Sequence, residues 1–383
     1  MDLVPIDPVT FTPGDIVEDY SSLIWTERYT DIGDFTITTR KIQKMRNLLP
    51  EWSFVSLLDS QQIMTVEDHQ IDKDAYGNKV LTITGRATET IFEGRTVNEP
   101  STSTGPADIG SDYLGVDAVV LYLYYAMNGI WDGGPDVALP AAISDSTSGS
   151  YGAFVTRFWT QGDVLTQIRG ILNQMNVGLR TLRPKNVDNT LQIITGGPPS
   201  FSRTAIDNTV LPVFDIYDGV DRSSTGTDSV TFDVLNGSLE DAKYLISRKG
   251  YYTGVKVYEN GGPLSATLFI PGLDPSVAGG FACKIKYVDG GSRGSLTSGQ
   301  MTTYLNQLAA VELAKVMVTT AVDFSVKNSP STPVYKVDYG LGDLVNLKMD
   351  YGINKQGRVT EIIRSKDSSG VKLYPTITVT DPT

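Results

Sequence analysis

Residues 59–97, DSQQIMTVEDHQIDKDAYGNKVLTITGRATETIFEGRTV, carry the strongest structural pattern in this chain. Polar and apolar residues alternate in 63–71 and again in 80–86, and a polar turn at 72–78, rich in Asp, Gly and Asn, joins the two runs. Two alternating runs joined by such a turn are typical of an antiparallel hairpin. We therefore expect strands at both runs.

The end of this segment has a different pattern. Residues 87–93 lose the alternation and predict one or two helical turns, with Ile91 and Phe92 able to cover the end of a sheet. Gly94 stops the helical turns, and 95–97 returns to strand. Strand, turn, strand, short helix and strand in under forty residues predict a small closed or nearly closed barrel with a helical plug.

Length and composition set the class of protein. The chain has 383 residues, 40% hydrophobic and 20% charged, which is ordinary for a soluble protein of two to four domains. No apolar run approaches the ~20 residues that cross a bilayer. The start, Met1 to Pro5, lacks a basic segment followed by an apolar one, so we expect no signal peptide and folding in a cytoplasm.

The formal net charge is −12, which argues against a nucleic-acid-binding protein, because such binding depends on Lys and Arg contacts to phosphates. Two interpretations of the charge stay open. The first is solubility alone. The second, if the chain forms a ring, is a passage of like charge through which DNA slides without binding.

The single cysteine and the single histidine limit the chemistry. Cys283 alone excludes an internal disulfide, and alternation places it on a buried strand face. His69 lies among polar residues, and we interpret it as a surface strand residue. Metal sites built on His or Cys are excluded by count. We predict no cofactor.

The rest of the chain alternates between helical and strand patterns. After a polar linker at 98–111, apolar residues spaced three and four apart predict helices at 116–127, from Val164 to Met175 and at 297–321. Residues 238–245 predict a short helix. Strands are predicted at 214–219, with 229–234 paired to it, at 251–258, 264–270 and 281–288, and at 341–349, 357–364 and 371–379.

One short pattern occurs twice. Gly33-Asp34 and Gly342-Asp343 both stand before an apolar strand. Glycine permits backbone angles that other residues avoid, and an Asp side chain bonds nearby amides, so we predict structural turns at these four residues. Chance recurrence and two similar barrels both remain open as explanations.

Catalytic patterns are weak. Residues 290–294, GGSRG, fit the G-x-S-x-G pattern of a serine nucleophile, but the only histidine precedes it and no helix follows directly. Asp72-x-Asp74 with Gly77 resembles the start of a calcium loop, yet Ile83 stands where its final Glu belongs. We interpret these segments as a glycine-rich loop and a hairpin turn. Loop carboxylates such as Asp132, Asp136 and Asp145 are expected to be solvated, and we predict no enzyme and no catalytic residue.

A family resemblance adds to this interpretation. The phrases IWTERYTDIGDFTI at 24–37, LTITGRATETIFEGRTV at 81–97 and YGLGDLVNLKMD at 339–350 resemble the tail-tip or baseplate hub proteins of long-tailed bacteriophages. The closest likeness is to the hub family of siphophages that infect actinobacteria, and the resemblance spans most of the chain in order.

The resemblance implies a mainly β, α+β fold like that of contractile-phage hubs, with two small β-barrel domains and an α+β middle lobe. The first barrel would comprise 1–98. The lobe would comprise 99–212 and 237–321, and the second barrel 213–236 and 322–383. Three protomers would then supply six barrels to a six-fold tail tube.

The resemblance also implies a function. The chain would be a structural minor tail protein of the virion that forms a homotrimeric ring, closes the tail tube and nucleates tip assembly. Its partners would be two further copies of itself, the distal tail protein, the tape-measure protein and other tail-tip proteins, with DNA only in transit and no stable membrane insertion. Lytic or receptor-binding duties are expected on other chains. The alternative is a tail module that binds or degrades a host glycan.

Overall fold

The computed structural model describes residues 1–74, 76–97, 115–128, 139–148, 162–183, 192–197, 200–205, 211–223, 228–247, 252–270, 283–294, 296–315, 319–326 and 332–380. The chain divides into two compact units. The first unit comprises Met1–Gly152, Phe158–Glu240 and Ser325–Thr383, and the second comprises Ala153–Arg157 and Asp241–Phe324. The three-domain division expected from the sequence stays a prediction.

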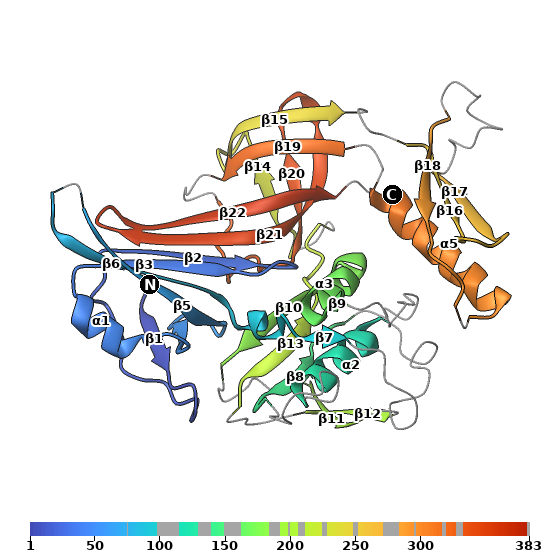
Figure 1. Cartoon of the computed structure of the whole chain (residues 1–383). Coiled ribbons are helices and arrows are strands. Elements are labelled where there is room, and N and C mark those ends of the chain that lie inside the picture. The colour runs from blue at the N-terminus through green and yellow to red at the C-terminus, as the bar shows by residue number, and fades with distance from the viewer. Residues whose placement is uncertain are drawn as a thin grey trace. The chain divides into compact units, whose positions relative to one another are not determined.

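A ten-stranded sheet forms the centre of the first unit (Figure 1). Its path is β1-β4-β5-β6-β3-β2-β21-β20-β14, and β22 pairs with the other side of β21. All neighbours are antiparallel except β14 and β20. The strands are β1 (Leu3–Ile6), β2 (Ser22–Arg28), β3 (Asp34–Thr39), β4 (Phe54–Leu57), β5 (Ile63–Lys73), β6 (Lys79–Ala87), β14 (Thr231–Asp233), β20 (Leu344–Lys348), β21 (Asn354–Asp367) and β22 (Gly370–Thr380).

This sheet differs from the two closed barrels that we expected. The long strand β21 pairs with β20 through residues 354–358 and with β2 through residues 361–366. Hydrogen bonding therefore continues from the N-terminal strands to the C-terminal strands, which lie side by side in blue and red in Figure 1. Within the described residues no sheet closes on itself. The coarser prediction, a mainly β fold with helices, is confirmed.

Alternation of apolar residues gives the N-terminal half of this sheet one buried face. Trp25 pairs in register with Phe35, and their rings stack with centroids 5.7 Å apart. Both rings are buried, and α1 (Ile42–Leu48) adds Met45 to the same core. Near the N-terminus, β1 forms the edge of the sheet and pairs with β4.

The predicted hairpin is confirmed. The pairing of β5 with β6 runs from Met64 opposite Ala87 to Lys73 opposite Lys79, with a bulge between Val66 and Asp68. Asp74 holds the turn, because its Oδ1 accepts from the amides of Tyr76 and Asn78, each at 2.9 Å. A hairpin turn, and not a calcium loop, therefore explains residues 72–78.

The predicted helical turn is confirmed as the 3-10 helix η1 (Thr88–Phe92). Phe92 is buried, with its ring centroid 4.8 Å from that of Phe214, whereas Ile91 is partly exposed. The following strand β7 (Thr96–Val97) pairs with β9 (Gly162–Asp163) and not with the main sheet, so the prediction that it completes a barrel is wrong.

An α+β region completes the first unit. Its five-stranded sheet has the order β10 (Gly178–Leu182), β13 (Val213–Tyr217), β8 (Ala142–Asp145), β11 (Gln192–Gly197), β12 (Ser200–Ala205). The predicted helices are α2 (Val116–Met127) and α3 (Val164–Met175), as expected. Asp163 caps α3, because its Oδ1 accepts from the Thr166 amide at 2.9 Å. The predicted pairing of 229–234 with 214–219 is wrong, since β14 pairs with β20 and β13 with β10 and β8.

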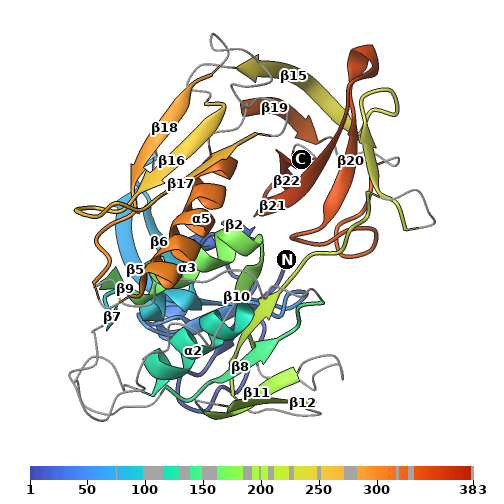
Figure 2. The same ribbon diagram turned by 90° about the vertical axis from the view of Figure 1, so that its right-hand side faces the viewer.

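The second unit packs a helix on a small sheet. Figure 2 shows α5 (Ser298–Lys315) against a sheet of order β17 (Ser265–Phe269), β16 (Gly254–Tyr258), β18 (Ile285–Asp289). The helix ends at Lys315, earlier than expected, because Thr319–Val326 is the strand β19 and its β-branched residues favour strands. Residues 239–245 belong to β15 (Leu239–Ser247), which pairs with β19, so the short helix predicted at 238–245 is wrong.

A second 3-10 helix in the described residues, η3 (Asp350–Gly352), lies between β20 and β21. Of the helices in the described ranges, none is both long and apolar enough to cross a membrane.

Candidate functional site

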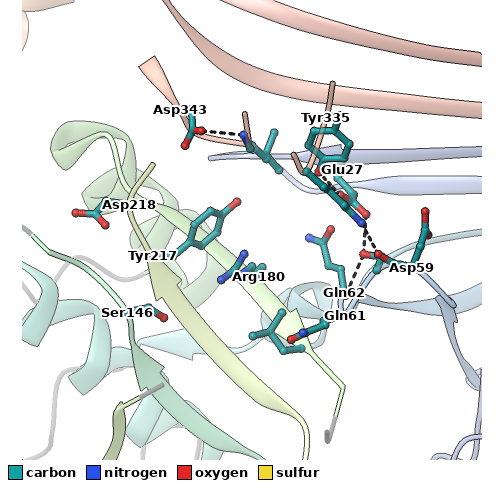
Figure 3. A pocket seen from close by; sticks show the side chains of 15 residues that line it. Glu27, Asp59, Gln61, Gln62, Ser146, Arg180, Tyr217, Asp218, Tyr335 and Asp343 are labelled. Atoms are coloured by element: carbon teal, nitrogen blue, oxygen red, sulfur yellow. Dashed lines mark hydrogen bonds between the residues drawn. The ribbon is translucent and has the colours of Figure 1, made fainter. Parts of the chain in front are cut away.

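A half-open cavity of about 520 Å³ lies in the first unit, and four segments meet at it. These are β2, the turn between β4 and β5, the paired strands β10 and β13, and the residues that precede β20 (Figure 3). The lining residues are Glu27, Asp59, Ser60, Gln61, Gln62, Ser146, Arg180, Leu182, Tyr217, Asp218, Tyr335, Lys336, Gly340, Leu341 and Asp343.

Glu27 is the most heavily bonded of these side chains. Its carboxylate is buried and accepts hydrogen bonds from Arg364 at 2.7 Å, Ser60 at 2.8 Å, Tyr335 at 2.9 Å and Trp25 at 3.1 Å. Burial acts to raise the pKa of Glu27. The positive charges of Arg364 and then Lys336 act to lower it and outweigh burial, so the net shift of the pKa is downward. Glu27 is therefore an ionised anchor in the wall of the cavity.

Arg364 joins two segments of the wall. Its Nη1 donates to both carboxylate oxygens of Asp59, at 2.9 and 2.8 Å, while its Nη2 holds Glu27. Lys336 donates to the backbone carbonyl of Asp59 at 2.6 Å, and burial lowers the pKa of its ammonium. Lys336 also has a positive φ of 67°, which is uncommon outside glycine. These bonds attach β21 and the segment before β20 to the β4–β5 turn.

The opposite wall comes from the five-stranded sheet. Arg180 on β10 pairs with Asp215 on β13 at 2.8 Å, and its guanidinium lies 4.1 Å from the ring centroid of Tyr217. Burial raises the pKa of Asp215 even though Arg180 opposes that shift. The backbone connects both walls as well, because Gln62 forms an isolated bridge with Leu182.

The four predicted turn residues lie before two strands. Gly342 and Asp343 precede β20, and Asp343 lines the cavity. The Asp343 carboxylate is buried and accepts from the amides of Val220 and Gly340, both at 2.8 Å, and from Arg222 at 2.6 Å.

The other pair stands at the start of β3, outside the cavity. A Cβ at Gly33 would lie 2.4 Å from the carbonyl oxygen of Thr26, so only glycine allows that approach. Asp34 is partly exposed and pairs with Arg28 at 2.5 Å. The role of the four residues as equivalent turns of two barrels stays a prediction.

The carboxyl groups of Glu27 and Asp59 are not poised as proton donors. Burial raises the pKa of Asp59 but Arg364 and Lys336 lower it more, as they do for Glu27, so both lining carboxylates remain charged near neutral pH. Asp343 is paired with Arg222, and Asp218 accepts from the amide and hydroxyl of Ser148. Sugar hydrolysis requires one carboxylic acid with a raised pKa beside an ionised one, and the arrangement here does not favour that chemistry.

The other candidate sites have structural explanations. Residues 290–294 form a loop in which Arg293 pairs with Glu259 at 2.8 Å, as expected for a glycine-rich loop. His69 was expected at the surface, but its side chain is buried and its Nε2 lies 2.8 Å from the Leu49 carbonyl oxygen. Cys283 is partly exposed and lies before β18, not on a buried strand face.

Two further observations concern acidic residues. Asp145 was expected to be a solvated loop residue, but it ends β8, is buried, and pairs with Arg203 at 2.8 Å. Asp132 and Asp136, like the linker at 98–111, lie outside the described residues. The described residues contain no group of three or more His, Cys, Asp or Glu side chains placed to hold a metal ion.

Sequence reasoning missed the residues that build the cavity. Glu27 and Arg364 are 337 positions apart, and neither belongs to a local motif. The one signal was the position of Glu27 just after the apolar residues Leu23, Ile24 and Trp25, where a buried charge would require a partner.

Solved structures share this fold. The tail protein from Neisseria meningitidis MC58 aligns with 100% of this chain and 97% of its own, at a TM-score of 0.54 and 11% identity. The 43 kDa tail protein of prophage MuSo2 from Shewanella oneidensis aligns with 100% of this chain and 98% of its own, at a TM-score of 0.53 and 11% identity. The prophage tail protein gp18 from Listeria monocytogenes EGD-e aligns with 100% of this chain and 95% of its own, at a TM-score of 0.51 and 13% identity. At these identities the likeness establishes the fold.

Sequence comparison identifies the family. No curated protein matches the chain. Residues 10–262, about two thirds of the chain, match the family described as Siphovirus ReqiPepy6 Gp37-like protein. The chain therefore belongs to the Siphovirus ReqiPepy6 Gp37-like protein family.

Proposed function

We propose that this chain is a structural hub of a siphovirus tail tip. The observation that carries the proposal is the fold, which is shared over the whole chain with three tail proteins, two of them from prophages, in a chain that belongs to a siphovirus family. Three copies form a closed ring that ends the tail tube in the virion. The distal tail protein, the tape-measure protein and other tip proteins are its partners.

The central sheet supports this role. Its first part, β1 to β6, comes from the N-terminal end of the chain, and its second part combines β14 with the C-terminal strands β20 to β22; β2 and β21 join the two parts. In the ring, each part serves as one barrel-like module, so that three protomers present six modules to a six-fold tube. The net charge of −12 suits a ring through which DNA passes without being held.

The ion pairs of the cavity support a structural and non-enzymatic role. Glu27, Asp59 and Arg364 connect β2, the β4–β5 turn and β21, and all their charges are used within the protein. Breaking a buried pair is strongly destabilising, whereas an intact pair fixes the arrangement of the segments that it joins. We infer that this cluster keeps the two parts of the sheet in one geometry during assembly.

Native mass spectrometry of the purified full chain tests the ring. We expect a species of about 125 kDa, three times the protomer mass of 41.6 kDa. Permanent assemblies of this kind bury roughly 2,000–5,000 Å² per interface, so the trimer should persist on dilution to nanomolar protein. Electron microscopy of the virion would locate three copies at the tail tip. A monomer or dimer within the assembled tip would refute the proposal.

The second candidate function is glycan binding by the tail. The cavity favours it over glycan degradation, because the lining carboxylates Glu27 and Asp59 have lowered pKa values. A release assay for reducing sugar on host cell walls should therefore give no signal above background.

A further inference from the structure

Two largely buried polar side chains of the cavity have no hydrogen-bond partner in the part of the chain that the structure describes. The side-chain amide of Gln62 and the hydroxyl of Tyr217 both line the cavity, and their residues are only 6% and 5% exposed. Gln62 uses its backbone amide and carbonyl in bonds to Ser60 and Ser56, but its side chain is in none. Tyr217 has ring contacts alone, to Tyr29 and Arg180.

These two groups converge. Figure 3 shows the amide of Gln62 and the hydroxyl of Tyr217 directed into the same space, with Arg180 beside them. The two residues come from different sheets, β13 and the turn before β5, so their convergence is a property of the tertiary fold. Most of each side chain is buried, and its polar atoms face the cavity, where they can bond only to water or to a ligand. Water fills such a site until a ligand displaces it.

Most charged groups at the cavity are already paired within the protein, which disfavours an ionic ligand. Arg180 is paired with Asp215, Arg364 with Glu27 and Asp59, and Asp343 with Arg222. An anion or a cation would have to break one of these pairs or add a charge without a counterion, and both are unfavourable in a buried site.

The polarity of the lining also argues against an inserted peptide. Leu182 and Leu341 are the only large aliphatic residues among the fifteen that line the cavity. Protein partners usually anchor an apolar or aromatic side chain in such a pocket. The groups that remain unpaired, an amide and a phenol, both donate and accept hydrogen bonds, as the hydroxyl groups of a sugar do.

We propose that this cavity binds a neutral saccharide unit, with the Gln62 amide and the Tyr217 hydroxyl as its principal hydrogen-bond partners. A volume of about 520 Å³ lies within the ~300–1,000 Å³ of small-molecule sites and accommodates one or two sugar rings. The inference goes beyond the hub role and does not depend on it, because a ring of three copies requires no saccharide.

Saturation-transfer NMR on the purified full chain tests the proposal. The probes are glucose, galactose, rhamnose, N-acetylglucosamine, cellobiose and diacetylchitobiose, with glucuronate and glucosamine as charged analogues. We expect at least one neutral sugar to bind, and the charged analogues to bind more weakly than their neutral parents. Failure of every neutral sugar to bind, or stronger binding of a charged analogue, would overturn the inference.

Two variants remove the proposed contacts. Gln62→Leu deletes the amide at similar volume, and Tyr217→Phe deletes the hydroxyl but keeps the ring against Arg180. Each should weaken sugar binding about tenfold, the effect of one lost hydrogen bond. The melting temperature of Gln62→Leu should stay unchanged or rise, since the side chain gives up no bond within the described protein.

Tyr339→Phe is the matched control. Tyr339 is also buried, and its hydroxyl also has no partner among the described residues, but it does not line the cavity. This variant should bind sugar like the unmodified chain. Equal binding by Gln62→Leu, Tyr217→Phe and Tyr339→Phe would show that the sugar lies elsewhere and would refute the assignment. The mass of the oligomer, measured on the same samples, reports on the hub role separately.

Discussion

Replacing Glu89 by Gln should make the chain more stable above pH 7 and leave it nearly unchanged at pH 4.5. Glu89 lies in η1 and is buried, and neither of its carboxylate oxygens has a hydrogen-bond partner among the described residues. Burial raises the pKa of Glu89 to about 7, and the backbone amide of Glu89 itself, followed by the hydroxyl and amide of Thr181, opposes only part of that shift.

The magnitude follows from proton linkage. The pKa of Glu89 rises from 4.5 in the unfolded chain to about 7 in the folded one. The folded state therefore holds the proton more tightly, and the free energy of unfolding falls as pH rises from about 4.5 to about 7. A difference of roughly 2.5 pH units corresponds to about 3 kcal/mol at ~1.4 kcal/mol per unit. A neutral amide removes this dependence, so the advantage of Glu89→Gln should grow to about 3 kcal/mol by pH 8.

Urea denaturation of both proteins at several pH values between 4.5 and 8, at one protein concentration, measures this difference. Glu93→Gln is the control, because Glu93 lies just after η1 but is partly exposed and paired with Arg86. An exposed pair contributes about 0–1 kcal/mol, so that variant should differ little from the unmodified chain across the range. If the stability gap between Glu89→Gln and the unmodified chain were the same at every pH, the carboxyl would not be buried as the structure shows.

Two further predictions concern an ion pair and a close backbone contact that connect segments of the first unit. Arg364→Met should lower the free energy of unfolding by about 3–5 kcal/mol, because it leaves the buried Glu27 carboxylate without its cation. Adding Glu27→Gln to this variant should restore part of the loss. A loss below about 1 kcal/mol for Arg364→Met in urea denaturation would contradict the prediction. Gly342→Ala should lower the free energy of unfolding by roughly 2–4 kcal/mol, because φ is +92° and the new Cβ would lie 2.4 Å from the Tyr29 ring. Gly77→Ala is the control: its φ is +82°, its new Cβ meets nothing within 4 Å, and it should lower that free energy by about 1 kcal/mol. Equal losses for the two variants would contradict the close contact at Gly342.

Local patterns in the sequence predicted local structure well. The hairpin at 63–87 carries its alternation and its turn residues within one short segment, and Asp74 makes the turn bonds that an Asp in this position favours. The start of α3 was visible for the same reason, since Asp163 stands directly before the apolar stripe and caps it.

Local patterns misled where distant strands compete for the same residues. Residues 238–241, Ser-Leu-Glu-Asp, resemble the capping sequence of a helix, yet they enter β15, which pairs with β19 some eighty positions later. The pairing of β14 with β20 instead of β13 is a second case. Helix and turn preferences amount to at most about 1 kcal/mol per residue, so a ladder of hydrogen bonds to a distant strand outweighs them.

The residues that form the cavity could not be predicted from the sequence for a related reason. A buried carboxylate such as Glu27 is tolerated only beside a cation, and one sequence contains many arginines that could supply it. Which arginine does so depends on β2 and β21 being neighbours, a fact of sheet topology that alternation does not encode. Gln62 and Tyr217 carried no signal at all, because an unpaired polar group becomes visible only when its surroundings are known.

The repeated Gly-Asp pattern shows how far a short motif can be extended into structure. Both copies stand at the start of a strand, but glycine is required for different reasons: Gly33 by the close carbonyl of Thr26, and Gly342 by a positive φ and the ring of Tyr29. The carboxylates differ as well, since Asp34 makes a partly exposed pair whereas Asp343 is buried and holds two backbone amides. The motif therefore marks where a strand begins, and the surroundings of each copy determine what the turn does.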